Sequence, residues 1–306
     1  MSQPKIVVVG SSNTDMIVKA ARIPAPGETI VGGSFTSAAG GKGANQAVAA
    51  ARAGGAVVFV ARVGNDMLGA QAVDGYAKEA INVSYIQRDC ELATGVALIM
   101  VDSTGNNSIS VASGANFALS VDDVQAAKDE IASAQIMVLQ LESPLETVEY
   151  AAKLAHDANV KVLLDPAPAP SDPLPPSLLQ YVDIIKPNEN EAEKLTGVKV
   201  TDQTSAQVAA EKLLELGAQI AIVTLGSAGS YVASKSGERL YVPARLVDAV
   251  DATAAGDAYT GALAVALAEN KSLKDAVDFA TKAASLSVQK LGAQPSLPTR
   301  AEIDVF

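Results

Sequence analysis

The sequence has no tryptophan, one cysteine and one histidine among its 306 residues. A lone Cys90 cannot form a disulfide within the chain, which is typical of proteins from a reducing compartment such as the cytoplasm. Cys90 and His156 together are too few ligands for a structural zinc site. A Ser–His–Asp hydrolase would depend on His156, and the G-x-S-x-G elbow of such enzymes does not occur. These absences argue against a disulfide within the chain, a structural zinc site and a Ser–His–Asp hydrolase.

Positive charge is also scarce, because acidic residues outnumber basic ones and the formal net charge is −11 at pH 7. Such a surface is unsuited to nucleic acid. No apolar run is long enough to span a membrane, and the N-terminal segment lacks the long apolar core of a signal peptide. We therefore expect a cytoplasmic protein that binds neither nucleic acid nor a membrane. Any phosphate site must take its positive potential from helix ends, a metal ion or a few lysines.

The apolar residues, 49% of the chain, fall into short β-branched runs that alternate with alanine-rich segments. We predict buried strands at 6–9, 57–60, 136–139, 160–164, 183–185 and 221–224. We predict helices at 44–53, 68–80, 121–132, 145–157, 189–195, 205–216, 257–268 and 273–291. This alternation indicates an α/β fold with a mostly parallel sheet and helices on both faces. The length would allow two domains, but the proline-rich stretch 166–176 is predicted to be a surface loop rather than a linker, so we predict one domain over 1–306.

Two regions, 29–37 and 94–111, break the alternation because they are strand-like and have no helix between paired runs. Around 96–101 both faces of the expected strand are apolar, which predicts cover on both sides. A small sheet that projects from the main body and packs on a partner would provide this cover. An ordinary internal strand would explain the pattern equally well.

The segment Asp251-Ala-Thr-Ala-Ala-Gly-Asp257 leads into the apolar run 258–267. The first turn of a helix presents free N–H groups and the positive end of the helix dipole, and therefore attracts anions. An aspartate beside a bound phosphate is a candidate base for the hydroxyl that attacks it. Considered alone, Asp257 is explained more simply as an N-capping residue of an alanine-rich helix.

Three further motifs place polar groups beyond predicted strands or at the start of a predicted helix. In Gly40-Gly-Lys-Gly-Ala-Asn45, Lys42 and Asn45 can face one site from a first helical turn, although the spacing is not that of a Walker A loop. Asn13 and Asp15 follow the first strand, and Glu142 follows the strand 136–139. In open α/β sheets, ligands bind beyond the carboxyl ends of strands.

A second set of motifs suits a nucleotide. Asn188 and Glu191 share a face at the start of a predicted helix, where an amide and a carboxylate could orient Mg²⁺ or its waters. The segment 224–229 follows a strand and supplies hydroxyls and flexible backbone. Acidic residues in a first turn and a β-turn after a strand also need no ligand. No G-x-G-x-x-G follows the first strand, so an NAD-dependent oxidoreductase has no fingerprint here.

In this order, the motifs resemble those of the ribokinase-like (phosphofructokinase-B-type) carbohydrate kinases, and among them the ribose-phosphorylating branch. The resemblance runs from residue 10 to residue 298. It includes Gly10–Asp15, Gly40–Gln46, Gly114–Asn116, Gln140–Glu142, Asp165–Pro168, Pro187–Glu189, Thr224–Gly226, Ala255–Asp257 and Gly292–Ser296.

The resemblance implies a three-layer sandwich with a nine-stranded, mostly parallel central sheet. It also implies a small β lid over the sugar, formed by about 14–38 and 94–112. Such lids often join two family members into a homodimer. The implied reaction converts D-ribose and ATP, with Mg²⁺ on the nucleotide, into ribose 5-phosphate and ADP.

The resemblance assigns roles to residues by motif position. The ribose contacts would be Asn13, Asp15, Gly41, Lys42, Asn45, Glu142 and the catalytic base Asp257. The N–H groups of 254–257 would form an anion hole. The ATP contacts would be Asn188, Glu191, Thr224, Gly226, Ser227, Gly229, Ala254, Ala255, Gly256 and Thr281. An activating K⁺ would be held by Asp251, Thr253, Ser287, Lys290, Gly292 and Ser296, several of them through carbonyl groups.

The sequence departs from the family pattern at three of these places, one of which is Lys290, at a position that is often Arg. Many relatives have Asp-Thr where this chain has Asp251-Ala252, and relatives often have His or Asn at the position of Thr281, near the adenine. Three alternatives stay open at this point: another kinase of the family, such as a fructokinase, deoxyribokinase or adenosine kinase; a non-catalytic sugar-binding protein on the same fold; and an NAD-dependent oxidoreductase.

Overall fold

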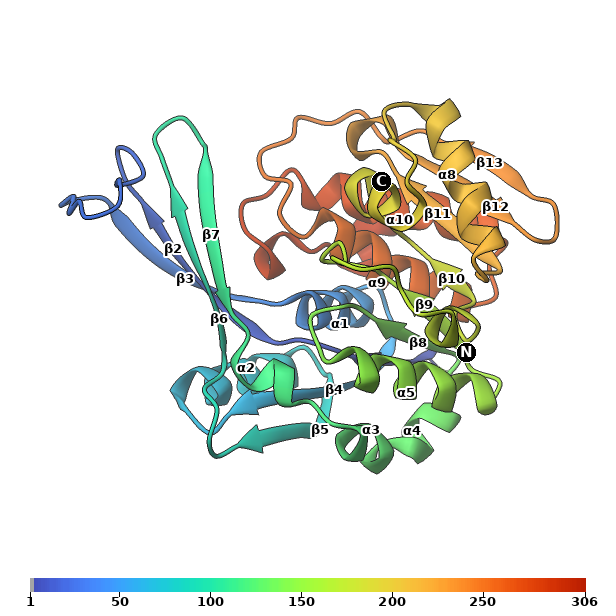
Figure 1. The fold of residues 1–306 in the computed structure, drawn as a ribbon, viewed down its shortest axis with the longest axis horizontal. Coiled ribbons are helices and arrows are strands. Elements are labelled where there is room, and N and C mark those ends of the chain that lie inside the picture. Colours follow the sequence, from blue (N-terminus) through green and yellow to red (C-terminus); the bar gives the residue numbers. More distant parts are fainter. Residues whose placement is uncertain (1–2) are drawn as a thin grey trace.

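A computed structural model describes residues 3–306 and places a nine-stranded sheet at its centre (Figure 1). The strand order is β13-β12-β11-β10-β9-β8-β1-β4-β5, and β12 alone runs opposite to the other strands. The strands are β1 (Lys5–Val9), β4 (Ala56–Gly64), β5 (Asn82–Asp89), β8 (Ile136–Leu139), β9 (Lys161–Leu164), β10 (Ile184–Ile185), β11 (Ile220–Thr224), β12 (Ser230–Ser234) and β13 (Arg239–Val242).

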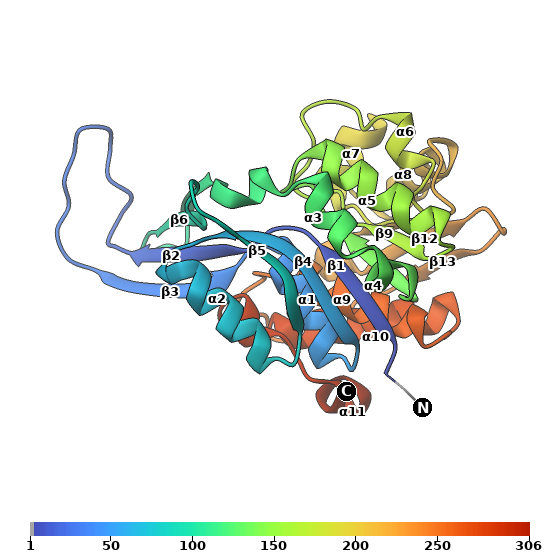
Figure 2. The ribbon, with the colours of Figure 1, turned by 90° about the horizontal axis from the view of Figure 1, so that it is seen from below.

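Helices cover both faces of this sheet, as Figure 2 shows from below. Along β1, Ile6 and Val8 pack into one core while Val7 and Val9 pack into the other, because successive side chains of a strand point to opposite faces. The first core is closed by α1 (Lys42–Arg52), α2 (Met67–Lys78), α9 (Ala255–Ala268), α10 (Leu273–Ser287) and α11 (Arg300–Val305). The second is closed by α3 (Val121–Ala126), α4 (Lys128–Ala132), α5 (Leu145–Asp157), α6 (Pro176–Leu179), α7 (Glu189–Thr196) and α8 (Gln203–Glu215). The predicted three-layer α/β architecture is confirmed.

Four strands form a separate small sheet, which we call the lid sheet, that projects to the left in Figure 1. Its order is β3-β2-β6-β7, with two antiparallel pairs joined by the parallel contact of β2 and β6. The strands are β2 (Asn13–Lys19), β3 (Ser34–Gly40), β6 (Gly95–Val101) and β7 (Asn107–Ala112). The outer-face residue Leu98 stays 55% exposed, so the cover predicted for both faces of β6 is incomplete in the single chain.

Several predicted boundaries were wrong for local reasons. The strand expected over 29–37 begins only at Ser34, because β2 ends at Lys19, opposite Ser34, and residues before Ser34 have no partner strand. The run 94–111, by contrast, forms two paired strands with no helix between them, as expected. The predicted helix 121–132 is interrupted at Ala127. The helix from 273 ends at Ser287 instead of 291, because the following residues turn back toward Val250 and Asp251. The strands β5, β12 and β13 were missed. Across residues 3–306, no helix combines the length and apolarity needed to cross a bilayer.

Candidate active site

Asp257 lies in the first turn of α9, and its carboxylate is buried against α1. The Asn45 Nδ2 group donates to Asp257 Oδ2 at 2.9 Å, and the Gln46 Nε2 group donates to Asp257 Oδ1 at 3.0 Å. Burial raises the pKa of Asp257 from its ordinary 3.8 to about 6, an effect that the Lys42 ammonium opposes and the Asp165 carboxylate reinforces. A buried carboxylate whose pKa lies closer to neutrality is a suitable general base.

The backbone that leads into α9 leaves N–H groups free at the start of the helix. Ala254, the residue before the helix, has a left-handed conformation with φ of 60°, and no side chain caps the helix. The Ala255 N–H donates to the Ala252 carbonyl at 3.2 Å. Within the described part of the chain, the N–H groups of Gly256 and Asp257 have no acceptor, so they are free to bind an anion at the positive end of the helix dipole.

On the side of Asp257 toward the lid sheet lie Asp15 and Glu142, the two other carboxylates predicted to bind ribose. Glu142 Oε2 accepts hydrogen bonds from the Ser11 hydroxyl at 2.5 Å and the Lys42 N–H at 3.0 Å. Burial raises the pKa of Asp15 to about 6, helped by the charges of Glu142 and Asp257. The pKa of Lys42 is raised because its burial, which acts in the opposite direction, is outweighed by the surrounding carboxylates. The cluster offers charged acceptors to hydroxyl groups.

Asn13 and Gly41 complete this region. Asn13 Oδ1 accepts from Asn116 Nδ2 at 2.7 Å, which fixes the orientation of its amide. Gly41 precedes α1 with φ of 88°, and a Cβ there would lie 2.7 Å from the Asn13 backbone nitrogen. Gly41 therefore combines a left-handed backbone with a close backbone approach, and both favour glycine. Asn45 Oδ1 is buried and has no hydrogen-bond partner within residues 3–306, which leaves an acceptor for a ligand.

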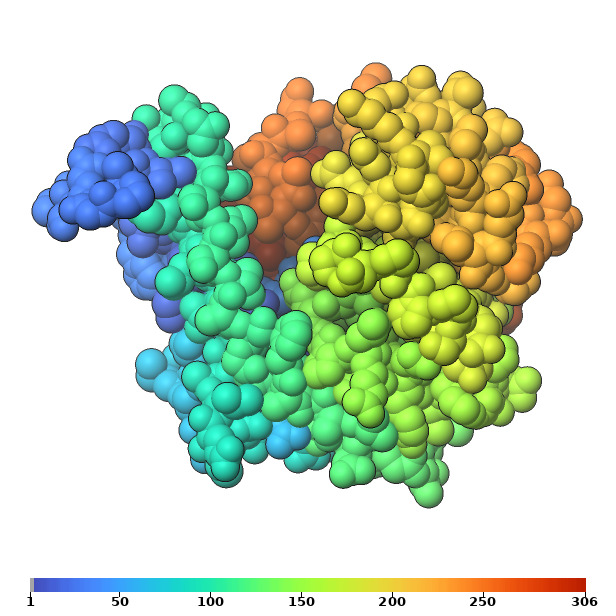
Figure 3. All heavy atoms as spheres, viewed as in Figure 1, coloured from blue at the N-terminus to red at the C-terminus, as the bar shows by residue number. Residues whose placement is uncertain are grey.

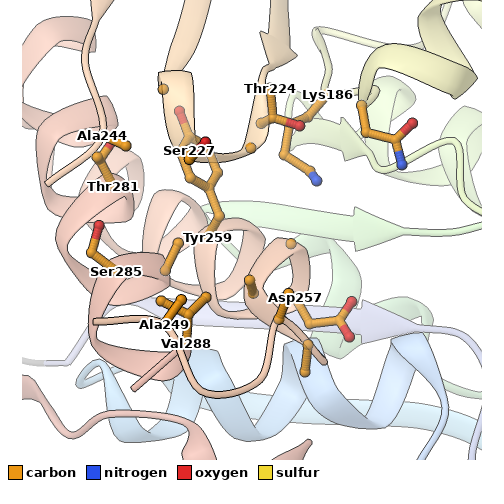
Figure 4. Close-up of a pocket in the computed structure, with 18 of the residues that line it drawn as sticks. Lys186, Thr224, Ser227, Ala244, Ala249, Asp257, Tyr259, Thr281, Ser285 and Val288 are labelled. Carbon is orange, nitrogen blue, oxygen red and sulfur yellow. The ribbon is translucent and has the colours of Figure 1, made fainter. Parts of the chain in front are cut away.

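On the other side of Asp257, a cavity of about 550 Å³ extends toward α10 and the β11–β12 turn (Figure 4). Figure 3 shows the surface hollowed between the lid sheet and the segment around residue 250. All the residues predicted to contact ATP line this cavity: Asn188, Glu191, Thr224, Gly226, Ser227, Gly229, Ala254, Ala255, Gly256 and Thr281. The cavity therefore lies directly against the first turn of α9, which Ala254, Ala255, Gly256 and Asp257 contribute to its lining.

Three of these predicted contacts already form hydrogen bonds within the protein. Asn188 and Glu191 form a capping box at the start of α7, in which each side chain accepts from the other's backbone N–H, at 2.9 and 2.8 Å. The Thr281 hydroxyl donates to the Val277 carbonyl of its own helix at 2.8 Å. Burial and the Asp165 charge raise the pKa of Glu191, so a cation near its second carboxylate oxygen would be favourable.

The residues predicted to hold a monovalent cation come together from two loops. Asp251 Oδ1 accepts from the Thr253 backbone N–H at 2.9 Å, and Asp251 Oδ2 accepts from the Gly292 N–H at 2.8 Å. The Val250 N–H donates to the Val288 carbonyl at 2.7 Å. Lys290 directs its ammonium to Glu302, 2.9 Å away, so only its backbone can face the loop. Ser287 and Ser296 are fully buried, and their hydroxyls donate to the Ala284 and Ala293 carbonyls.

Three side chains near Asp257 were assigned no role from the sequence. Asp165 is buried and forms an ion pair with Lys186, whose Nζ lies 3.3 Å from Asp165 Oδ2. Both residues line the cavity, and Gln46 bridges Asp165 to Asp257. Asp165 and Gln46 belong to motifs that carry the family resemblance. Their place in these motifs was the sequence signal by which they could have been found. Lys186 directly precedes another such motif.

The sequence matches the profile of the pfkB family of carbohydrate kinases over residues 3–300. The chain belongs to the pfkB carbohydrate kinase family. It is 43% identical over 297 residues to a ribokinase of Haemophilus influenzae, covering 97% of this chain and 96% of that one. It is 36% identical over 301 residues to a deoxyribokinase of Salmonella typhimurium, covering 98% of each chain. The structure of Arabidopsis thaliana ribokinase complexed with ribose and ATP superposes with a TM-score of 0.92 and 35% identity, covering 100% of this chain and 98% of that one.

This pfkB kinase therefore has the ribokinase-like fold that its sequence predicts. The family also accounts for the arrangement just described, since a phosphotransferase needs an acceptor hydroxyl, a base and a nucleotide phosphate at one point. Asp257 and the free N–H groups of α9 lie where the polar cluster under the lid sheet meets the large cavity.

Proposed function

We propose that this pfkB kinase transfers the γ-phosphoryl group of ATP to O5 of D-ribose. The observation that carries the proposal is the position of Asp257. Its buried carboxylate lies between the polar cluster of Asp15, Lys42 and Glu142 and the cavity lined by the predicted nucleotide residues. The similarity to ribokinases over nearly the whole chain supports ribose as the acceptor.

In this proposal the sugar lies beneath the lid sheet, held by Asn13, Asp15, Gly41, Lys42, Asn45 and Glu142. Asp257 accepts the proton of the 5-hydroxyl as the oxygen attacks the γ-phosphorus atom. The N–H groups of 254–257 then stabilise the negative charge of the phosphoryl group in transit, an effect commonly worth about 3 kcal/mol. The raised pKa of Asp257 suits it to hold that proton and release it after transfer.

Mg²⁺ and K⁺ belong to the proposal. Glu191 and Asn188 supply the oxygen donors that Mg²⁺ prefers, and Asp165 Oδ1 is buried nearby without a hydrogen-bond partner among residues 3–306. Mg²⁺ supplies charge neutralisation of the ATP phosphates. The loops that meet through Asp251 and Gly292 have the carbonyl-rich chemistry that suits K⁺, with Asp251, Thr253, Ser287, Lys290, Gly292 and Ser296 as ligands or supports.

A homodimer through the lid sheet is part of the same proposal. Leu98 and Phe35 expose 55% and 62% of their surface on one face of this sheet. Ile109 and Val111 are exposed on its other face, at 55% and 52%. Exposed apolar side chains that gather on one surface are typical of interaction sites, and a second copy of this chain packed on the face that carries Leu98 and Phe35 would bury these two.

The proposed substrate is tested by measuring kcat/KM with ATP for a panel of D-ribose, 2-deoxy-D-ribose, D-fructose and adenosine. We expect ribose to give the highest value. A higher value for deoxyribose would favour the alternative raised by the Salmonella typhimurium relative. No turnover of any acceptor above that of Asp257→Asn would favour a non-catalytic sugar-binding protein.

A further inference from the structure

Gln46 occupies a buried position between two carboxylates beneath the proposed base. Its side chain extends from α1 and is inaccessible to solvent. The same amide nitrogen, Nε2, donates to Asp165 Oδ2 at 2.8 Å and to Asp257 Oδ1 at 3.0 Å. A primary amide has two N–H groups, so one serves each carboxylate. Gln46 thereby joins the base to a second buried acid.

Gln140, which follows β8, contacts the oxygen end of this amide. The Gln140 Nε2 group donates to Gln46 Oε1 at 2.7 Å. If the Gln46 amide turned over, its oxygen would face both carboxylates and its nitrogen would face the Gln140 donor. Gly10 makes room for Gln140, because a Cβ at Gly10 would overlap Gln140 Oε1. Gln46, Gln140 and Asp165 thus form one hydrogen-bonded network, and Gly10 packs against it.

The far end of this network is the buried Asp165, whose negative charge is balanced by a lysine. The Asp165 carboxylate is paired with the Lys186 ammonium, with both side chains no more than 4% exposed. Asp165 Oδ2 also lies 3.2 Å from the Thr260 hydroxyl. The Asp165 charge raises the pKa of Asp257, and the Gln46 hydrogen bond lowers it. Removing Gln46 would leave two buried carboxylates facing each other without a donor between them.

We propose that Gln46 is a positioning residue that holds the Asp257 carboxylate against the anchored Asp165–Lys186 pair, and that Gln140 sets the orientation of the Gln46 amide. The inference rests on the proposed role of Asp257 as the base. Gln46 bonds to Asp257 Oδ1, while Asn45 bonds to Oδ2. Two donors on different oxygens define the plane of the carboxylate, and with it the direction from which it can accept a proton.

Other charges also act on the Asp257 carboxylate and are unaltered by a change at Gln46. They are the Lys42 ammonium on α1, the Asp15 carboxylate on β2 and the Asp165 carboxylate after β9, with Glu142 after β8, Lys186 after β10 and Glu191 on α7 near them. With these constant, loss of the Gln46 donor acts in one direction only: it destabilises the ionised form of Asp257.

The first test is Gln46→Leu, which keeps a buried side chain of similar bulk and removes both donors. We expect kcat for ribose to fall by about 10- to 100-fold, the usual effect of a misplaced catalytic group, while KM for ribose changes by less than about threefold. The acid limb of the pH profile of kcat/KM should move to higher pH by about one unit, as expected when a charged acceptor loses one hydrogen bond. The matched control is Gln180→Leu, since Gln180 is exposed and bonds only to the nearby Ser177 carbonyl.

The second test asks whether Gln140 acts through Gln46. Gln140→Leu should move the acid limb in the same direction and lower kcat by less than Gln46→Leu. The double variant should resemble Gln46→Leu alone, because a residue that acts through Gln46 has no effect once Gln46 is gone. An unmoved acid limb with kcat within about twofold, or fully additive losses, would overturn the inference. If Gln46→Leu does not fold, Gln140→Leu alone carries the test of the acid limb.

A titration separates this inference from the proposed substrate. The carboxyl signal of Asp257 can be followed by ¹³C NMR against pH without sugar, with Asp257→Asn used to assign it. If the wild-type chain fails to phosphorylate ribose, the substrate proposal fails while the titration still reports on Gln46. We expect the midpoint to rise in Gln46→Leu. An unchanged midpoint would contradict the inference, whatever the substrate.

Discussion

Replacing the proposed base by its amide, Asp257→Asn, has two consequences that the structure allows to be worked out separately. The first is catalytic. The amide cannot accept the proton of the 5-hydroxyl, so kcat should fall by about 10²- to 10⁴-fold, the range typical of a lost general base. This range corresponds to about 3–5 kcal/mol of transition-state stabilisation. The affinity for ribose should change little, because the other proposed sugar contacts are retained.

The second consequence concerns stability and follows from the pKa of Asp257. Burial raises that pKa from 3.8 to about 6, so between these values the folded state binds more protons than the unfolded state. Folding stability therefore falls as pH rises through this window, and the full penalty applies above about pH 6. A difference of about two pH units corresponds to about 3 kcal/mol. Asp257→Asn removes the penalty, and we expect it to stabilise the fold at pH 7.5 by up to this amount.

The neighbourhood can accept the new amide. Asp257 receives donors on both oxygens, so the amide nitrogen would initially face one of them. Asn45 Oδ1 has no partner in the described chain, so a turn of the Asn45 amide would present an acceptor instead. This rearrangement costs free energy, so about 3 kcal/mol is an upper limit for the stabilisation by Asp257→Asn.

The assay combines steady-state kinetics with urea denaturation at pH 7.5 and pH 5. We expect a variant with little activity that is more stable than the wild type at pH 7.5, with the difference smaller at pH 5. A variant that keeps more than a tenth of the wild-type kcat would refute the role of Asp257 as base. A variant less stable than the wild type at pH 7.5 would refute the burial argument for its pKa.

Three further predictions follow from the same site. Lowering the pH below about 6 should reduce kcat/KM for ribose progressively, because Asp257 and Asp15 become protonated; a profile that is flat between pH 5 and 7 would contradict this. Replacing K⁺ by tetramethylammonium should reduce kcat, and Asp251→Ala should remove the difference between the two salts; equal rates in both salts for the wild type would argue against a cation site at this loop. Leu98→Lys should shift the mass measured by light scattering from dimer to monomer, whereas Val208→Lys, at an exposed position of α8, should not; a dimer that survives Leu98→Lys would argue against the lid-sheet interface.

The fold could be predicted from the sequence because its signals are local. Runs such as Ile6–Val9 and the alanine-rich segment after Gly43 identify buried strands and helices, and their alternation indicates a parallel sheet. The errors occurred where long-range contacts decide. The helix from Leu273 stops at Ser287 because the next residues bond to Val250 and Asp251. No local pattern records that contact.

The candidate site could also be predicted from the sequence in part. Its polar residues follow strands or begin helices, so their convergence at the carboxyl edge of the sheet was expected. The Asp165–Lys186 ion pair and the Gln46 bridge were not predicted. Gln46 and Asp165 are 119 positions apart in the sequence, and a buried glutamine in an alanine-rich helix carries no local signal of its two partners.

The measurement that tests the central claim most directly is a crystal structure of the chain with ribose and a non-hydrolysable ATP analogue. The proposed function predicts that a carboxylate oxygen of Asp257 lies within about 2.6–3.2 Å of the 5-hydroxyl oxygen of ribose. It also predicts that the γ-phosphate faces the N–H groups of Gly256 and Asp257. A sugar bound with its 5-hydroxyl turned away from Asp257, or a γ-phosphate outside this anion site, would contradict the account.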